Sequence, residues 1–225
     1  MLSVLSFLQE LQTHNNRDWF EAHRTQYREA QQHFNAFTAE LIRGVEAFDP
    51  SVRNVDVKDC TYRIYRDIRF SPDKSPYKNH FGAYICPGGR KSGYAGYYFH
   101  IEPEQGHYIG GSLLACGVYC PDKAVLASIR EEICDQGEAF VQAVRQAEGF
   151  GWDEEYKLKK VPQGFPKDSP YADYLKYKDY TLLQYIPQEL LADDRQLMQF
   201  CLRELKKTVA FNTILNRAVA YALGQ

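Results

Sequence analysis

Several features that identify whole classes of protein are missing from this chain of 225 residues. No apolar run approaches the length of a membrane-spanning helix, which argues against an integral membrane protein. Residues 1–11 lack a basic segment and a small-residue cleavage site, so we expect no secretory signal and a cytoplasmic location. The six cysteines are scattered, and Cys116 and Cys120 do not form a CxxC pair, so we expect reduced thiols.

Motifs that would identify a known catalytic chemistry are also absent. The sequence has no His-Glu-x-x-His and no Gly-x-Ser-x-Gly. Ser-x-x-Lys occurs at Ser71 and Ser75, as in penicillin-interacting enzymes, but the companion Lys-Thr-Gly is missing. Residues 88–92 lack the first glycine of a phosphate-binding loop. The sequence therefore predicts no metal or cofactor and leaves open whether the protein is an enzyme.

The composition that is present is that of an ordinary globular protein, with 44% hydrophobic and 25% charged residues. A chain of this length buries roughly 70% of its unfolded surface, so a large core is available without disulfides or metals. We see no internal repeat or low-complexity tract. A single domain over residues 1–225 is therefore expected.

Hydrophobic spacing divides the chain into helical and extended parts. Apolar residues recur every three or four positions in the first fifth of the chain, whereas runs of Tyr, Ile and Phe separated by Pro and Gly follow it. The fold class is thus α+β, with a central antiparallel sheet covered by N- and C-terminal helices. We predict four segments: helical 1–50, with one helix over 17–48; sheet 59–115, with strands near 60–70, 80–86, 95–102 and 107–115 and a loop at 87–93; helices and a long irregular loop over 121–178, with a second helix after Gly137; and a strand near 179–186 followed by helices to 225.

Charge is unevenly distributed along the chain. The net charge of the whole chain is −2, but residues 63–91 carry +5 and the remainder carries −7. A basic segment inside an acidic protein indicates a focused anion site, because an extended polyanion would need a wider basic surface.

The basic segment begins with the predicted strand over 60–70. The side-chain period of two places Arg63 and Arg69 on one face with Tyr65 and Asp67. The other face holds Ile64, Ile68 and Phe70, which we expect to be buried.

Arg66 falls on the apolar face of this strand. Either a bulge redirects its side chain, or it is buried and paired, since an unpaired buried guanidinium would be too costly. We expect its partner to be a backbone carbonyl or one of the carboxylates of Asp67, Asp73 and Glu102.

The prolines after this strand would restrain Lys74 and Lys78, and guanidinium and ammonium groups together are suited to phosphate or carboxylate. The alternative is a surface strand joined by structural Arg–Asp pairs. We predict that Arg63, Arg69, Lys74 and Lys78 converge on one concave surface, with Tyr77 and His100 at its edge. The full set of predicted ligand-binding residues is Arg63, Arg66, Asp67, Arg69, Asp73, Lys74, Tyr77, Lys78 and His100.

A second group lies on the third predicted strand. Tyr98, His100 and Glu102 share one face, and His80 or His107 is placed to join them across the sheet. This pattern fits a metal or acid/base group, or hydrogen-bonded sheet residues beside a tyrosine.

Four runs of this sequence resemble a known family. They are Asn15-Asn16-Arg17-Asp18-Trp19-Phe20, the run from Tyr65 to Lys78, His80-Phe81-Gly82-Ala83-Tyr84, and Gly96-Tyr97-Tyr98-Phe99-His100-Ile101. Together they resemble the family catalogued as domain of unknown function 2461, over nearly the whole chain. The resemblance implies a single domain and directs attention to residues 63–111, but it implies no activity, cofactor or catalytic residue.

Three functional hypotheses follow. The first is a pocket or enzyme site for a small anionic ligand, and the second is a non-enzymatic domain that binds an unknown protein. The third is a single-stranded nucleic-acid binder, which the 17 tyrosines favour and the net acidity disfavours.

Overall fold

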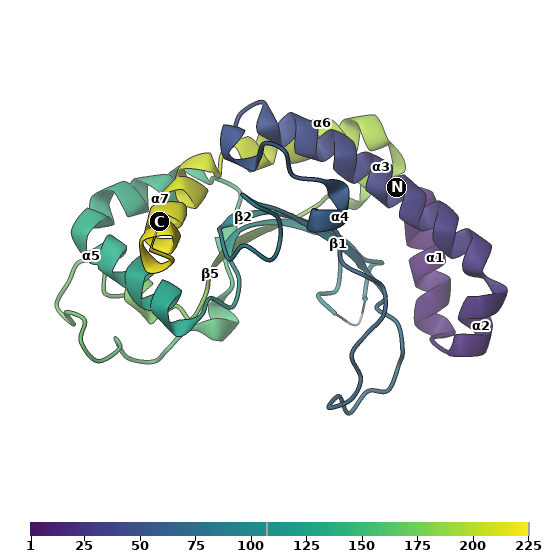
Figure 1. Cartoon of the computed structure of the whole chain (residues 1–225), viewed down its shortest axis with the longest axis horizontal. Coiled ribbons are helices and arrows are strands. Elements are labelled where there is room, and N and C mark those ends of the chain that lie inside the picture. The colour runs from purple at the N-terminus through teal and green to yellow at the C-terminus, as the bar shows by residue number, and fades with distance from the viewer. Residues whose placement is uncertain (107, 225) are drawn as a thin grey trace.

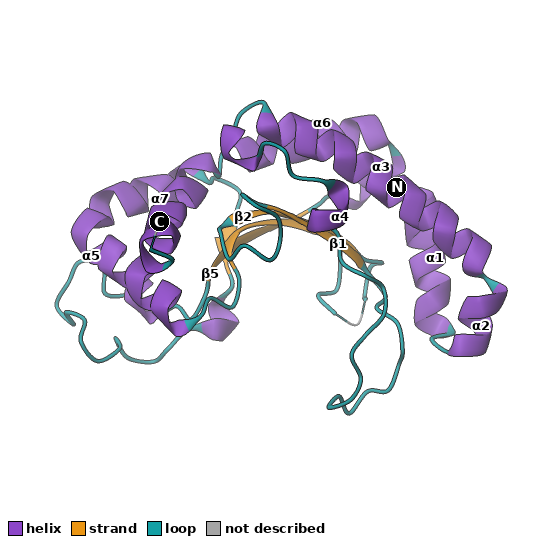
Figure 2. Ribbon diagram, viewed as in Figure 1, coloured by secondary structure: helices purple, strands orange, loops and turns teal. Residues whose placement is uncertain are grey.

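The computed structural model describes residues 1–106 and 108–224, and its centre is an antiparallel sheet (Figures 1 and 2). Within these residues the sheet has five strands in the order β1-β2-β3-β5-β4. The predicted α+β single domain, with a central antiparallel sheet and helices from both ends of the chain, is confirmed. The strands are β1 (Phe81–Ile85), β2 (Gly96–Ile101), β3 (Leu113–Val118), β4 (Gly151–Trp152) and β5 (Tyr180–Tyr185).

One face of the sheet is covered by helices. Helices α3 (Arg24–Glu46) and α6 (Asp194–Lys206) pack on each other and lie over this face (Figure 1). Along β2, Tyr97 and Phe99 point into this core, because successive side chains of a strand face opposite ways. Tyr98 and His100 therefore face the other side of the sheet.

The predicted helix over 17–48 is two helices in the structure. Helix α2 (Arg17–Ala22) ends at His23, where α3 begins, and α1 (Leu2–Thr13) precedes both. An asparagine caps α2: the Asn16 side chain accepts a hydrogen bond from the Trp19 amide at 2.9 Å. Trp19 stacks on the ring of His23 with centroids 4.0 Å apart, and this contact stabilises the junction between α2 and α3.

A second helical layer closes the other end of the sheet. Helices α5 (Lys123–Gln146) and α7 (Val209–Ala222) pack together there (Figure 1). The predicted start of a second helix after Gly137 corresponds to a kink in α5, where Gln136 has φ −124° and ψ 33°. A Cβ on Gly137 would stand 2.1 Å from the Tyr171 ring, so glycine permits this close packing.

Residues 149–178 are largely irregular, which agrees with the long irregular loop predicted within 121–178. It contains β4 and two short 3-10 helices, η2 (Glu154–Tyr156) and η3 (Tyr174–Lys176). Buried Arg130 of α5 anchors it by donating hydrogen bonds to the carbonyls of Leu175 and Tyr177, both at 2.9 Å. The remaining short elements are η1 (Pro50–Val52), α4 (Val57–Cys60) and η4 (Gln188–Ala192).

The predicted strand over 60–70 is wrong. This segment makes only isolated bridges, and although Ile64 is buried, Ile68 is only partly buried and Phe70 is 94% exposed. Its backbone pairs with its own return segment instead: the Arg66 amide bonds to Pro76 and the Lys78 amide bonds to the carbonyl of Ile64.

Residues 66–76 consequently form a loop, which we call the basic loop, that projects on the side of the sheet away from α3 and α6 (Figure 1). The face shared by Arg63 and Arg69 in the prediction does not exist, because residues 60–70 do not form a strand.

The strand predicted over 107–115 begins six residues late, at Leu113. The backbone amides of Tyr108, Ile109 and Gly110 turn toward a carboxylate rather than a neighbouring strand. The strands predicted at 80–86, 95–102 and 179–186 correspond to β1, β2 and β5 to within one residue, β4 was not predicted, and 87–93 is a loop as expected.

Candidate functional site

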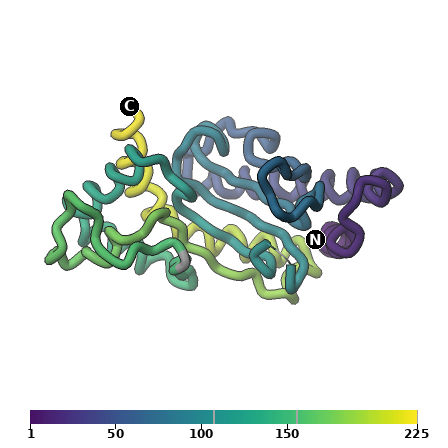
Figure 3. Tube along the Cα trace, turned by 90° about the horizontal axis from the view of Figure 1, so that it is seen from below, coloured from purple at the N-terminus to yellow at the C-terminus, as the bar shows by residue number. Residues whose placement is uncertain are grey.

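The sheet face away from α3 and α6 forms the floor of a groove of about 1020 Å³ (Figure 3 views the molecule from this side). Strands β1, β2, β3 and β5 supply the floor. One wall comes from both ends of the basic loop and the residues flanking it, and Asp153 and Tyr156 of the irregular segment line the groove as well.

Tyrosine is the dominant side chain of this groove. Several of these rings are open to solvent, including Tyr108 at 59% and Tyr119 at 60% exposed. Tyrosine presents an apolar ring face with a hydrogen-bonding tip, so the lining suits a ligand with both apolar and polar parts. The tyrosines of the lining are Tyr62, Tyr77, Tyr84, Tyr94, Tyr98, Tyr108, Tyr119, Tyr156 and Tyr185.

Two cations meet over one of these rings. Lys78 Nζ lies 5.4 Å and Arg90 Cζ 5.6 Å from the centre of the Tyr62 ring, and we call these three residues the cationic corner. Neither cation pairs with a carboxylate in the part of the chain that the structure describes. Burial, together with the charges of Arg63 and Arg90, lowers the pKa of Lys78. The corner is therefore a site of uncompensated positive charge.

Arg66 is paired, as predicted. Its guanidinium forms an ion pair with Asp73 and donates hydrogen bonds to the Ser75 carbonyl at 3.1 Å and to Ser71 Oγ at 3.3 Å. The hydroxyl and amide of Ser75, and then Arg66, lower the pKa of Asp73 to about 2. Arg66, the first residue of the basic loop, is therefore linked to residues 71–75 of the same loop.

The predicted convergence of Arg63, Arg69, Lys74 and Lys78 is not seen, because only Lys78 lines the groove. Arg69 is exposed and pairs with Asp67 at 2.6 Å, and the ammonium group of Lys74 donates to the carbonyl of Ile68 at 3.1 Å. Arg63 is exposed outside the lining. Of the nine predicted residues, those that line the groove are Arg66, Asp67, Asp73, Tyr77 and Lys78.

The wall that carries Lys78 is fixed to the N-terminal helices. The Asn15 side chain donates to the Tyr77 carbonyl at 2.9 Å and accepts from the Tyr77 amide at 3.1 Å. The Tyr77 ring stacks on Phe20 with centroids 3.9 Å apart. These contacts hold Lys78 in position before any ligand arrives.

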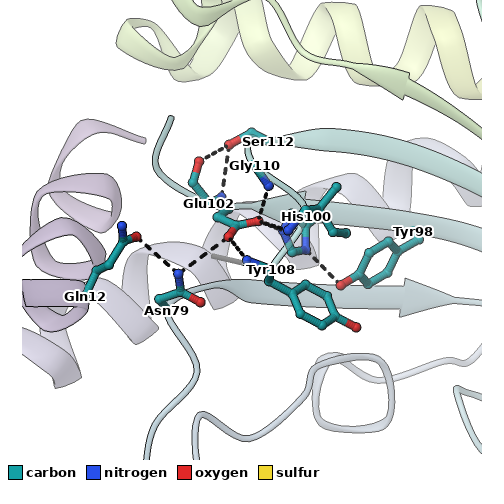
Figure 4. A network of polar contacts seen from close by, with 9 residues as sticks. Gln12, Asn79, Tyr98, His100, Glu102, Tyr108, Gly110 and Ser112 are labelled. Carbon is teal, nitrogen blue, oxygen red and sulfur yellow. Dashed lines mark hydrogen bonds and ion pairs between the residues drawn. The ribbon is translucent and has the colours of Figure 1, made fainter. Parts of the chain in front are cut away.

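Three hydrogen-bonded polar side chains follow one another along the groove face of β2 and the residue just after it (Figure 4). Tyr98 Oη lies 2.9 Å from His100 Nδ1, and His100 Nε2 lies 3.0 Å from Glu102 Oε2. The side chains of His100 and Glu102 are fully buried, whereas Tyr98 is partly buried and lines the groove. The predicted grouping of these three residues on one face is therefore confirmed.

Three backbone amides form a cradle of hydrogen-bond donors around the carboxylate of Glu102. The amides of Tyr108, Ile109 and Gly110 donate to its carboxylate at 2.8, 2.9 and 3.3 Å. Burial alone would raise the pKa of Glu102, but the hydrogen bonds from His100, Tyr108 and Ile109 outweigh it and lower the pKa overall. Glu102 is thus a buried, ionised carboxylate.

His80 joins this group by ring contacts. Its ring centroid lies 4.8 Å from that of His100 and 4.3 Å from that of Tyr108. Burial, then the neighbouring His100, lower the pKa of His80 to about 3, so this imidazole is neutral at physiological pH. The other predicted neighbour, His107, lies outside the described residues.

A metal centre is not supported by the described residues, among which no group of three or more His, Cys, Asp or Glu side chains is arranged to hold an ion. The Tyr98–His100–Glu102 arrangement remains suited to acid/base chemistry, because it joins a groove-lining hydroxyl to an imidazole and a carboxylate.

A carboxylate with a raised pKa lies near the opposite part of the groove. Asp179 is 4% exposed, and burial together with the groove residue Asp153 raises its pKa to about 6. A carboxyl whose folded-state pKa exceeds the unfolded value costs stability when ionised. The cost is absent below the unfolded pKa of about 3.9 and complete above the folded value.

We therefore expect Asp179→Asn to stabilise the protein at pH 7 by about 2–3 kcal/mol, because the variant no longer has to ionise a buried carboxyl. The gain should shrink as the pH falls from 6 to 4. Urea denaturation at several pH values checks this, with exposed Asp168→Asn as the control. An equal gain at pH 4 and pH 7 would contradict it.

Sequence reasoning missed most of the groove lining. Tyr62 and Arg90 were not predicted as site residues, although Arg90 lies in the basic segment. Glu102 was grouped with His100 but not included in the ligand site. One signal in the sequence could have identified this face: side chains alternate along β2, and Tyr98 and His100 fall on the face of the sheet that α3 and α6 do not cover.

Comparison with known proteins identifies the family of the chain. The family described as conserved hypothetical protein (DUF2461) matches residues 3–213, so the chain belongs to this family, as its motifs suggested. No curated protein and no solved structure matches it. No helix in the described part of the chain is both long and apolar enough to cross a membrane.

Proposed function

We propose that this member of the DUF2461 family binds a small anionic ligand, carrying a phosphate or carboxylate group, in the tyrosine-lined groove. The observation that carries the proposal is the cationic corner, where Lys78 and Arg90 flank the Tyr62 ring without a carboxylate partner among the described residues. A bound anion would supply the charge that both cations lack.

The surroundings of the corner support this proposal. Burial of Lys78 weakens the competition of water for its ammonium group, and the contacts of Asn15 and Phe20 with Tyr77 fix the wall in place. A preformed site loses less entropy on binding. Arg90 also donates Nη1 to the Lys58 carbonyl at 2.8 Å, which orients its guanidinium.

Calorimetric titration of phosphate, nucleotides and sugar phosphates tests the proposal. We expect Lys78→Gln and Arg90→Gln each to weaken binding by about 1.5–3 kcal/mol, the contribution of a hydrogen bond to a charged group. Lys91→Gln and Arg69→Gln are matched controls, because both side chains are exposed and lie outside the groove lining. These controls should bind like the wild type.

Three outcomes would contradict the proposal. Equal weakening by the control variants would indicate a nonspecific effect of charge. Binding of single-stranded oligonucleotides but of no small anion would favour the nucleic-acid hypothesis. Absence of binding to every probe would favour a protein-interaction domain.

A further inference from the structure

We propose that Tyr98, His100 and Glu102 form a proton relay that removes a proton from a hydroxyl group, of a ligand or of water, bound in the groove. Tyr98 would be the catalytic residue, and His100 and Glu102 would act through it. The proposal deepens the proposed function and rests on it, because the same groove would hold the hydroxyl-bearing anion.

The geometry determines the direction of the relay. An ionised carboxylate only accepts hydrogen bonds, so His100 Nε2 carries the proton that is donated to Glu102 at 3.0 Å. His100 Nδ1 then has a lone pair and accepts from the Tyr98 hydroxyl at 2.9 Å. Tyr98 also lines the groove, and because burial raises the pKa of its phenol, it gives up its proton only to a base in direct contact.

The proton balance of the step is simple. The bound hydroxyl gives its proton to Tyr98 Oη, and Tyr98 gives its own proton to His100 Nδ1. His100 becomes an imidazolium beside the buried carboxylate of Glu102, which stabilises the new charge. The proton returns by the reverse path when the product accepts it, so no oxidant or further reactant is needed.

Three structural features go beyond what a purely structural hydrogen bond requires. The three backbone amides on Glu102 keep it ionised and in place. The neutral ring of His80 packs on His100 without adding a competing positive charge. Gly82 pairs with His100 across the sheet, and a Cβ there would stand 2.5 Å from Tyr98 Oη. Glycine thus leaves the space that the phenol needs to reach His100.

The experiment uses a neutral arylsulfonyl fluoride, which needs no cationic corner and reacts with activated phenols. In this reaction a bond forms between Tyr98 Oη and sulfur, the sulfur–fluorine bond breaks, fluoride leaves, and the phenol proton passes to His100 Nδ1. Mass spectrometry of the labelled protein measures the rate at each tyrosine. We expect Tyr98 to react faster than Tyr221, although Tyr221 is 76% exposed and lies outside the groove lining.

The variant His100→Gln should slow labelling of Tyr98 about 100-fold, the lower end of a general-base contribution, and leave Tyr221 unchanged. Tyr98→Phe identifies the labelled site, and Tyr221→Phe is the matched control. Equal labelling of Tyr98 in wild type and folded His100→Gln would overturn the relay.

A second measurement covers the case in which His100→Gln does not fold. Nitrogen NMR of the histidine rings in the wild type should show His100 protonated at Nε2 and not at Nδ1 near neutral pH. A proton on Nδ1 would overturn the relay. Labelling with no anion binding would refute the proposed function alone, whereas anion binding with slow labelling would refute the relay alone.

Discussion

Replacing Glu102 by alanine is expected to destabilise the protein by about 3–5 kcal/mol, because removing one partner of a buried charged network leaves the others uncompensated. The substitution leaves His100 Nε2 and the amides of Tyr108, Ile109 and Gly110 without their acceptor. Urea denaturation followed by circular dichroism measures the loss.

The neighbouring glutamate provides the matched control for this prediction. Glu104 is exposed, and Glu104→Ala should change the free energy of unfolding by no more than about 0.5 kcal/mol. Similar effects of the two substitutions would show that the cradle around Glu102 does not stabilise the fold.

Truncating Phe99 is expected to have a comparably large effect, about 3–5 kcal/mol for Phe99→Ala, from lost burial and the cavity left behind. Phe99 is fully buried, and its ring lies 5.0 Å from that of Phe37 and 5.7 Å from that of Phe34, both on α3. It therefore joins the sheet to the helix that covers it, and the midpoint of guanidinium denaturation should fall.

The same substitution at Phe70 is the control. Phe70 is 94% exposed at the basic loop, so Phe70→Ala should stay within about 0.5 kcal/mol of the wild type. A loss at Phe70 as large as at Phe99 would imply that the loop is packed in solution, as the sequence pattern had predicted.

The contrast between these two phenylalanines shows where sequence patterns succeed. The alternation of apolar and polar side chains around Phe99 belongs to a strand, β2, that is paired on both sides, with β1 and β3. Its period of two therefore has a physical cause. The alternation around Phe70 looks alike, but prolines turn the chain back and the amides of Arg66 and Lys78 bond within the segment. Pattern alone does not show which backbone groups pair.

Local chemistry predicted part of the site correctly. The cost of an unpaired guanidinium predicted that Arg66 would be paired, and the ion pair with Asp73 confirms it. Strand period predicted that Tyr98, His100 and Glu102 would share a face, and they form one hydrogen-bonded chain. Both predictions depend on residues close together in the sequence.

By itself, the sequence determined the α+β class, most of the strands and the location of a basic segment, because these follow from spacing and charge within short stretches of chain. Only the tertiary structure decided which cations face the groove. Lys78 and Arg90 meet over Tyr62 because the basic loop folds back on itself and the 87–93 loop lies against Lys58 and Asp59, whereas Arg69 pairs with Asp67. Such meetings depend on long-range backbone pairing and burial, which no local pattern encodes.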